Sequence, residues 1–380
     1  MKLKYFPILL LILLFCFDKI FIIPQVRKFV VQNHVNSYEV LDTLLDKLYL
    51  EHIDKNQKVL GKTVEEIQRE TILFMGTSRS VEYANLNKTL FDKNPYIKNK
   101  QALEQIPVTS WTVRAAPFIH IYQIYSHFLK KHPRPKMLVL EINYISFNKN
   151  NVFREKKDIY DFTLEEFSEV YEELSNKDKI EYLSTLFFVL NKSNISWKSL
   201  IRSGGNSDQD VNATLDFVIN AKKLMEMKEN KNSGWMHGIK EHQESPEQIE
   251  INRKYTEWVI QSFFQNFQMD LTSSNLFKKV LREAKEKNIN LVLYRPRTHE
   301  ELKSSTKKYT KGEAEWLLEV KRLAKEASIP FYDFEEPGYL ECDYFADTSH
   351  LSKSCFPEVV EKIVLEGRER IPRMNTDEHK

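Results

Sequence analysis

The chain has 380 residues, 42% of them hydrophobic and 12% aromatic, which is enough to bury the core of one large domain or two smaller ones. Lys and Arg total 56 against 54 for Asp and Glu, so the net charge of +2 produces no long-range field that would attract a polyanion. No basic block is interleaved with aromatic residues, and we therefore expect no nucleic-acid partner.

The N-terminus begins with the basic stretch Met1-Lys2-Leu3-Lys4 and continues with an apolar run from Tyr5 to Phe17. No small residues mark a cleavage site, and the bulky Phe15 before Cys16 argues against lipoprotein processing. We therefore expect an uncleaved membrane anchor over residues 1–24, because the apolar stretch approaches the ~20 residues that a bilayer core requires. The alternative is a buried N-terminal helix of a soluble protein.

Residues 25–69 have apolar residues at helical spacing among polar ones, which predicts an amphipathic helical stalk or a packing arm. From residue 71 the pattern alternates between strand and helix. Strands are predicted over 71–75, 106–113 and 137–142, with a helix over 117–131. The near-continuous apolar run of the third strand is typical of a parallel strand that is covered on both faces.

A charged, largely helical segment over 150–272 interrupts this alternation, and we interpret it as a helical insertion. The alternation then resumes through strands and helices over 274–287, 290–294, 311–326, 329–334 and 356–366. Strands that alternate with helices indicate an α/β fold with a parallel sheet.

The three cysteines are Cys16, Cys342 and Cys355. Since Cys16 lies in the apolar N-terminal run, Cys342 and Cys355 are the only plausible disulfide pair. Their spacing fits no common zinc pattern, and we favour two unpaired thiols. The sequence predicts no metal site and no cofactor.

Two short patches carry the chemistry. Gly76-Thr77-Ser78-Arg79-Ser80 follows the first strand, so Ser78 is expected at the carboxyl end of a strand, where open α/β sheets build their sites. Asp347-Thr348-Ser349-His350 places an acid and a histidine three residues apart in a loop near the C-terminus. Serine catalysis needs a hydroxyl, a base and an acid that orients the base. The alternatives are that Ser78 simply caps a helix and that His350 is a surface histidine.

The two patches, in this order, resemble the blocks of the SGNH (GDSL-like) hydrolase superfamily over residues 70–150 and 275–365. Together with the N-terminal anchor they look closest to membrane-tethered envelope members. These are the alginate O-acetylation proteins, the D-alanine transfer protein of teichoic acids and an uncharacterised SGNH-like family of spirochaetes. The resemblance implies a three-layer α/β/α sandwich with a central parallel sheet, an N-terminal membrane helix and a helical insertion.

For the site, the resemblance implies Ser78 as nucleophile, His350 as base and Asp347 as the acid that orients His350. Ordinary members add a glycine and an asparagine to the oxyanion hole. Asn143 is the candidate for the asparagine, whereas Arg114-Ala115-Ala116 stands in the approximate place of the glycine, which has no clear counterpart. A catalytically inactive binding or scaffold protein with the same fold is therefore the alternative to an enzyme.

The segment after the strand over 290–294 holds Arg295, Arg297 and His299, which are candidates for binding an anionic or carbohydrate substrate. The alternative is a solvated basic loop.

The expected organisation is an anchor over 1–24, a stalk over 25–69, an SGNH-like α/β domain over 70–149 and 273–367, the insertion over 150–272 and a polar tail over 368–380. The expected function is a membrane-anchored acyl esterase or O-acyltransferase acting on an envelope polysaccharide or related ester. We expect a single-pass protein of the cytoplasmic (inner) membrane whose globular part faces the periplasm or the cell exterior. Positive charge on both flanks of the anchor leaves this orientation unsettled by the charge rule, and the sequence predicts no oligomeric state.

Overall fold

The computed structural model describes residues 6–20, 38–86, 88–113, 116–151, 162–187, 239–240 and 245–366. The chain divides into two compact units. The first consists of Met1–Thr43 and Glu155–Met227, and the second of Leu44–Arg154 and Lys228–Lys380. The expected polar tail over 368–380 lies outside the described residues, as does Arg114-Ala115.

The described helical segments that lie wholly in the first unit are α1 (Phe6–Ile20), α8 (Leu164–Val170), the 3-10 turn η4 (Tyr171–Glu173) and α9 (Asn176–Phe187). Helix α8 begins with a capping box in which Thr163 and Glu166 bond to each other's backbone N–H groups. Helix α1 is apolar and 15 residues long. Within the ranges described above, no helix combines the length and the apolar character needed to cross a membrane. The anchor expected over 1–24 also includes residues 1–5 and 21–24, which are outside those ranges.

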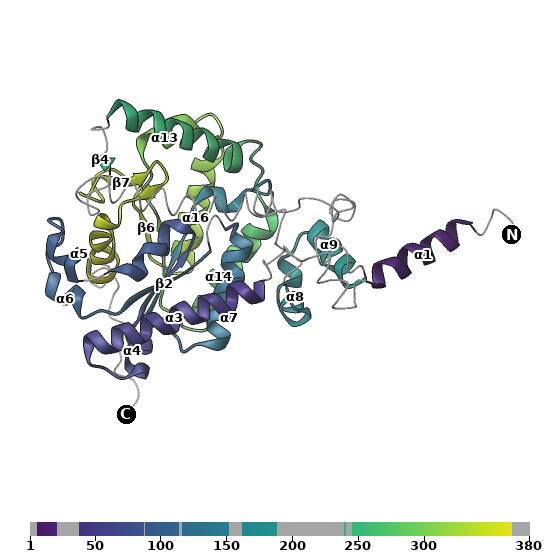
Figure 1. The fold of residues 1–380 in the computed structure, drawn as a ribbon, viewed down its shortest axis with the longest axis horizontal. Coiled ribbons are helices and arrows are strands. Elements are labelled where there is room, and N and C mark those ends of the chain that lie inside the picture. Colours follow the sequence, from purple (N-terminus) through teal and green to yellow (C-terminus); the bar gives the residue numbers. More distant parts are fainter. Residues whose placement is uncertain are drawn as a thin grey trace. The chain divides into compact units, whose positions relative to one another are not determined.

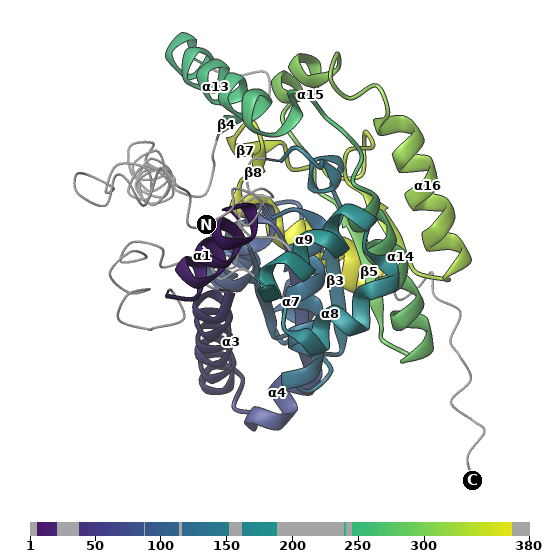
Figure 2. The same cartoon turned by 90° about the vertical axis from the view of Figure 1, so that its right-hand side faces the viewer.

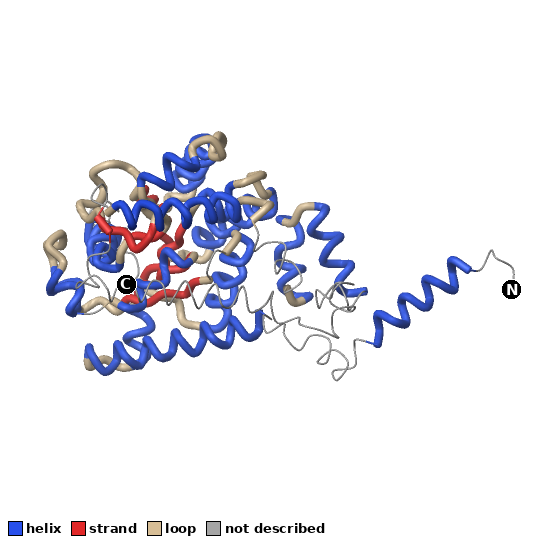
Figure 3. The backbone as a smooth tube through the Cα atoms, turned by 45° about the horizontal axis from the view of Figure 1, so that its top comes forward, coloured by secondary structure: helices blue, strands red, loops and turns tan. Residues whose placement is uncertain are grey.

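The second unit is built on a five-stranded sheet, and its neighbouring strands all pair in parallel. The strands, in their spatial order, are β2 (Val108–Thr112), β1 (Ile72–Gly76), β3 (Met137–Glu141), β5 (Leu291–Arg295) and β6 (Phe331–Asp333). Every residue of β1 and β3 is buried, as expected for parallel strands with both faces covered. Figure 3 shows these strands in red between the helices.

Helices cover both faces of this sheet, which therefore forms the middle layer of a three-layer α/β arrangement (Figures 1 and 2). The α-helices are α3 (Tyr38–Leu60, in the second unit from Leu44), α4 (Val64–Glu70), α5 (Lys88–Lys93), α6 (Lys100–Glu104), α7 (Phe118–Lys131), α13 (Pro246–Val259), α14 (Leu271–Glu286), α15 (Glu300–Thr306), α16 (Glu313–Glu326) and α17 (Phe356–Glu361). Tighter or wider turns are η2 (Ser78–Asn85), η3 (Tyr144–Phe147), η5 (Ile260–Phe264), η6 (Lys353–Cys355) and η7 (Lys362–Glu366).

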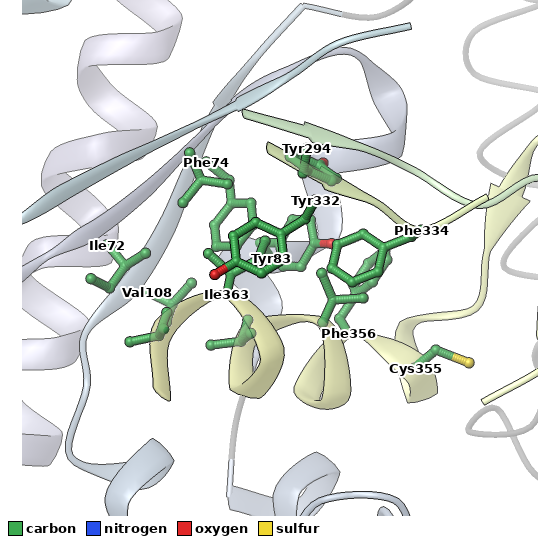
Figure 4. Packing of buried hydrophobic residues seen from close by; sticks show 14 of the residues in the cluster. Ile72, Phe74, Tyr83, Val108, Tyr294, Tyr332, Phe334, Cys355, Phe356 and Ile363 are labelled. Carbon is green, nitrogen blue, oxygen red and sulfur yellow. The ribbon is translucent and has the colours of Figure 1, made fainter. Parts of the chain in front are cut away.

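One face of the sheet packs on the C-terminal helix. Ile72 and Phe74 from β1 lie in a single buried cluster with Phe356 and Ile363 from the α17–η7 segment, and Figure 4 shows the two sets of side chains facing each other. Since apolar burial provides the main stabilisation of a fold, α17 and η7 are an integral part of this layer.

The opposite face packs on α3 and α7. Tyr49 of α3 contacts Trp111 of β2 and Phe128 of α7 edge to face, with ring centroids 5.7 and 5.3 Å apart. Helix α14 lies beside α7, with Phe277 against Phe118. The second half of α3 is therefore a packing arm against the sheet.

A second, small sheet joins β4 (Ile239–Lys240), β7 (Tyr344–Asp347) and β8 (His350–Leu351) in antiparallel pairs. Strands β7 and β8 form a tight hairpin, where the sequence predicted a loop. A disulfide between Cys342 and Cys355 closes the base of this hairpin. The expectation of two unpaired thiols was therefore wrong, because the hairpin brings two cysteines 13 positions apart to a Cα–Cα distance of 5.4 Å.

The predicted strands of the main sheet and the predicted helices around it are confirmed, with ends that shift by up to three residues. Helix α14 starts at Leu271 because Asp270 caps it by accepting the N–H of Ser273. It ends where Asn288 adopts a positive φ of 50°, a conformation that Asn tolerates after a helix.

Candidate active site

The site lies where the strand order reverses. Strand β1 connects to β2 on one side, whereas β3 lies on the other side of β1. In an open α/β sheet the loops after two such strands separate and leave room for a ligand at their carboxyl ends. Here the two loops carry Ser78 after β1 and Asn143 after β3.

The turn after β1 holds Ser78 at the first position of η2. Thr77 is the N-cap, since its side chain accepts the N–H of Arg79. The hypothesis that Ser78 is only a cap is therefore wrong. Gly76 is needed just before this turn, because a Cβ atom there would lie 2.3 Å from Cβ of Glu141.

The hairpin β7–β8 supplies the acid and the histidine. Asp347 and His350 are paired across its two strands, and Thr348 and Ser349 form the turn. Residues opposite each other in an antiparallel pair lie side by side. The three-residue spacing of Asp347 and His350 therefore places the carboxylate beside the imidazole through the hairpin alone.

The structure brings the three sequence-predicted side chains together. The Oγ atom of Ser78 lies 2.8 Å from Nε2 of His350. Nδ1 of His350 lies 2.9 Å from both carboxylate oxygens of Asp347. These are the contacts through which a histidine can take a proton from a serine while a carboxylate fixes its tautomer.

Asp347 is buried and saturated with donors. Its Oδ1 atom accepts the N–H groups of Ser349 and His350 and the hydroxyl of Ser349. Burial acts to raise the pKa of Asp347, but attraction to His350 and the hydrogen bonds from His350 and Ser349 outweigh it and lower that pKa below 3.8. The carboxylate therefore keeps its negative charge near His350 at neutral pH.

Helix α13 packs on the turn of the hairpin, and Figures 1 and 2 show it lying over β7. The Tyr255 hydroxyl is 3.0 Å from Oγ of Ser349, and the Thr256 hydroxyl donates to Oγ1 of Thr348 at 2.9 Å. Burial raises the pKa of Tyr255 well above 10, so its hydroxyl remains a donor. Tyr255 and Ser349 were missed by sequence reasoning, because no pattern connects α13 with a turn more than 90 positions away.

Asn143, the candidate oxyanion donor, lies after β3 and is buried. Its amide N–H donates to Oε1 of Glu141 at 2.8 Å, and its carbonyl oxygen accepts the N–H and hydroxyl of Ser146. An amide NH₂ group has two N–H donors, and the described contacts of Asn143 account for one of them. The role of Asn143 in an oxyanion hole stays a prediction.

The three candidates for substrate binding make different contacts; they are Arg295, Arg297 and His299. Arg295 pairs with Glu313 at 2.6 Å and with Asp333 at 3.5 Å, so it ties β5 to α16 and β6. His299 caps α15 through the N–H of Glu301.

Arg297 lines a small hollow together with Arg79 and Leu351, the residues that follow Ser78 and His350. Arg297 also donates to the Cys342 carbonyl at 3.5 Å and lies over the Phe345 ring. Of the predicted substrate-binding arginines, Arg297 therefore shares a hollow with Arg79 of the Ser78 turn, and Arg295 forms ion pairs between elements of the fold.

The chemistry available at the site is that of Ser, His and Asp. In the ranges that the structure covers, no group of three or more His, Cys, Asp or Glu side chains is arranged to hold a metal ion.

Fold and site together define a three-layer α/β protein with a Ser–His–Asp constellation at the carboxyl edge of a parallel sheet. The chain belongs to the family described as "Protein of unknown function (DUF1574)", whose profile matches residues 1–366. A search of curated proteins found no match.

Proposed function

We propose that this protein is an SGNH-like serine acyl esterase or O-acyltransferase. The observation that carries the proposal is the pair of contacts made by His350, at 2.8 Å to Oγ of Ser78 and at 2.9 Å to Asp347. A helix cap or a surface histidine needs neither contact.

In the proposed reaction, Oγ of Ser78 attacks the ester carbonyl carbon while its proton passes to Nε2 of His350. The C–O bond of the ester then breaks, and His350 returns the proton to the leaving oxygen. The backbone N–H of Ser78 and the Asn143 amide are the candidate donors to the oxyanion, and loss of one such donor typically costs ~10²–10³ in rate.

In the second half-reaction an acceptor hydroxyl gives its proton to His350 and attacks the acyl group on Ser78. The Ser78 oxygen leaves and recovers the proton. Water as acceptor makes the protein an esterase, and a glycan hydroxyl makes it an O-acyltransferase.

An envelope ester is the proposed substrate class. The apolar α1 helix and the Cys342–Cys355 disulfide support it, because structural disulfides persist outside the reducing cytosol. We place the protein in the cytoplasmic membrane by an anchor within 1–24, with the second unit on the extracytoplasmic side. Arg297 is the proposed contact for an anionic or carbohydrate part of the substrate.

The test is covalent labelling by a fluorophosphonate probe, together with hydrolysis of a short-chain acyl ester. Wild type should be labelled and active, whereas Ser78→Ala should be neither. His350→Ala should be labelled at a strongly reduced rate. Ser304→Ala is a matched control, because this serine also lies on a helix, and its described side-chain hydrogen bond goes to the local Glu301 carbonyl. Equal labelling of wild type and Ser78→Ala would exclude the mechanism.

One observation favours a second function, a non-catalytic binding protein of the same fold. The described hydrogen bonds of the Asn143 side chain go to Glu141 and Ser146. If Asn143 serves the fold alone, the oxyanion hole is incomplete. Wild type would then bind an acylated glycan without releasing the acyl group, which a binding assay with product analysis distinguishes from turnover.

The membrane anchor has its own test. Alkaline carbonate washing should leave the full-length protein in the membrane pellet, and protease added to spheroplasts should digest the second unit. Release into the soluble fraction would exclude the anchor. Protection from protease would place the catalytic unit in the cytoplasm and change the substrate class to soluble esters.

A further inference from the structure

Glu141, the last residue of β3, has no exposed surface although it carries a carboxyl group. It lies in a strand that is otherwise Met-Leu-Val-Leu, where a buried carboxylate is costly unless donors compensate it. Four donors do so. Oε2 accepts the N–H of Thr77 at 2.8 Å and the hydroxyl of Ser80 at 2.6 Å. Oε1 accepts the hydroxyl of Thr77 at 2.5 Å and the amide of Asn143 at 2.8 Å.

Three of these four bonds come from Thr77 and Ser80, the residues on either side of Ser78-Arg79. The backbone closes the same turn, since Ser80 donates its N–H to the Thr77 carbonyl at 3.0 Å. The carboxylate therefore holds both ends of the segment that presents Ser78. The fourth bond orients Asn143 from the neighbouring strand.

The network continues away from the site. The hydroxyl of Tyr294 bonds to Oγ of Ser80, and burial raises the pKa of Tyr294 well above 10, so this tyrosine remains a donor. Gly76 completes the arrangement, because a side chain at this position would displace Glu141.

We propose that Glu141 is a positioning residue that couples the Ser78 turn to Asn143. The inference rests on the proposed function, because it concerns the reaction of Ser78. Glu141 does not touch the substrate. It determines the direction of the Ser78 Oγ and N–H groups and of the Asn143 amide, and misplacement of reacting groups by about 1 Å can cost ~10²-fold in rate.

Glu141→Gln is the informative variant, because each carboxylate oxygen accepts two donors. In one orientation the new NH₂ group faces the Thr77 N–H, and in the other it faces the Asn143 amide; that bond is lost, because neither of these donors can accept. The hydroxyl on the same side, of Ser80 or Thr77, must turn round to accept instead of donate. We expect kcat for a short-chain ester and the rate of fluorophosphonate labelling to fall by ~10- to 100-fold, with little change in KM. Glu141→Asp, which keeps the carboxylate, should recover part of this loss.

Glu361→Gln is the matched control. Glu361 is also buried and also accepts backbone N–H groups of a distant segment, those of Lys98 and Asn99, but it lies on α17. The Glu361→Gln variant should be less stable than wild type. At a temperature where it is folded, its labelling rate should equal that of wild type. A double-mutant cycle of Glu141→Gln with Asn143→Ala should be non-additive, since the two side chains bond to each other.

Hydrogen exchange separates this inference from the proposed function. The peptide that contains Thr77 to Ser80 should exchange faster in Glu141→Gln than in wild type, whether or not the protein is active. Unchanged exchange would show that the Glu141 carboxylate does not hold this turn in place. If wild type is labelled at Ser78 and Glu141→Gln is labelled equally fast, the positioning role is wrong and the function stands. If wild type is not labelled at all, the proposed function is wrong, and so is the role of Glu141 in the reaction. Hydrogen exchange then still shows whether Glu141 holds the turn in place.

Discussion

The hydroxyl of Tyr255 lies 3.0 Å from Oγ of Ser349, and the Ser349 hydroxyl in turn donates to Asp347 at 3.0 Å. A residue of α13 is thus connected to the carboxylate that orients His350. Helix α13 falls within 150–272, the segment that the sequence presented as an insertion, so part of this segment supports the site.

Tyr255→Phe should lower the rate of ester hydrolysis or probe labelling by ~3- to 10-fold, because it removes one hydrogen bond from the chain that reaches Asp347. Tyr309→Phe is the control, since Tyr309 packs against the same apolar cluster as Tyr255. The two rates are compared at a temperature where both variants are folded. Equal rates in the two variants would show that the chain from Tyr255 does not influence the reaction.

Asp347 should make stability depend on pH in acid. Its pKa is lower in the folded state than the 3.8 of a free side chain, so its stabilisation is present above about pH 4 and is lost as the pH falls through the folded pKa. The loss of unfolding free energy in Asp347→Asn should therefore be largest near neutrality and should shrink as the pH falls toward 3. Urea titrations at a series of pH values measure this difference.

Glu358→Gln is a control in which the pH dependence of stability should have the opposite sign. Burial raises the pKa of Glu358 despite hydrogen bonds from the N–H groups of Glu341 and Cys342. A carboxyl whose folded pKa is raised favours folding in acid and loses that contribution as the pH rises. The wild-type advantage over Glu358→Gln should therefore decrease with rising pH. If the stability difference from wild type changed with pH in the same direction for Asp347→Asn and Glu358→Gln, the opposite pKa shifts assigned to the two carboxyl groups would be wrong.

The disulfide should stabilise the hairpin that carries Asp347 and His350. Cys342 and Cys355 close a loop of 13 positions, for which loop-closure entropy predicts ~3 kcal/mol. Replacing both cysteines by Ser should lower the free energy of unfolding by about 2–4 kcal/mol and reduce labelling of Ser78. Cys16→Ser is the control, since Cys16 is exposed and outside the disulfide. A reductant that lowers the melting temperature of Cys16→Ser but leaves the double variant unchanged would support the assignment, and no effect on either would contradict it.

Gly76→Ala should disrupt the Ser78 turn from the strand side. The new Cβ atom would lie 2.3 Å from Cβ and 2.6 Å from Oε2 of Glu141, and overpacking of this kind costs about 1–3 kcal/mol. Gly312→Ala is the control, because its nearest neighbour is only the hydroxyl end of Tyr144, at 3.1 Å. Melting temperatures and labelling rates should fall in the first variant and change much less in the second. Equal melting temperatures would argue against the tight packing of Gly76 on Glu141.

Much of the main sheet could be predicted because its strands are short, continuous apolar runs that need two covered faces. Ser78 was predictable as the end of such a run, and Asp347 with His350 by their mutual spacing. The hairpin around them was not predictable, because its strands have four and two residues and no resolvable periodicity.

Long-range contacts explain what else was missed. The partner of Cys355 depends on the hairpin, and the contact of Tyr255 depends on how α13 docks. Glu141 did leave a signal, because a carboxylate at the end of an apolar strand must find donors in the fold. Three of its four bonds come from Thr77 and Ser80 in the turn after β1, more than 60 positions away, to which no local pattern points.

Ser78 and His350 lie 272 positions apart, and this separation has a consequence for biosynthesis. The ribosome synthesises Ser78 first and His350 272 positions later, followed by helix α17, which packs on the sheet. Every nascent chain that ends between these two residues therefore carries the hydroxyl of Ser78 without the imidazole of His350 beside it. A chain that stops before residue 350 contains β1 and the Ser78 turn but lacks His350, so the full constellation arises only after residue 350 has been synthesised.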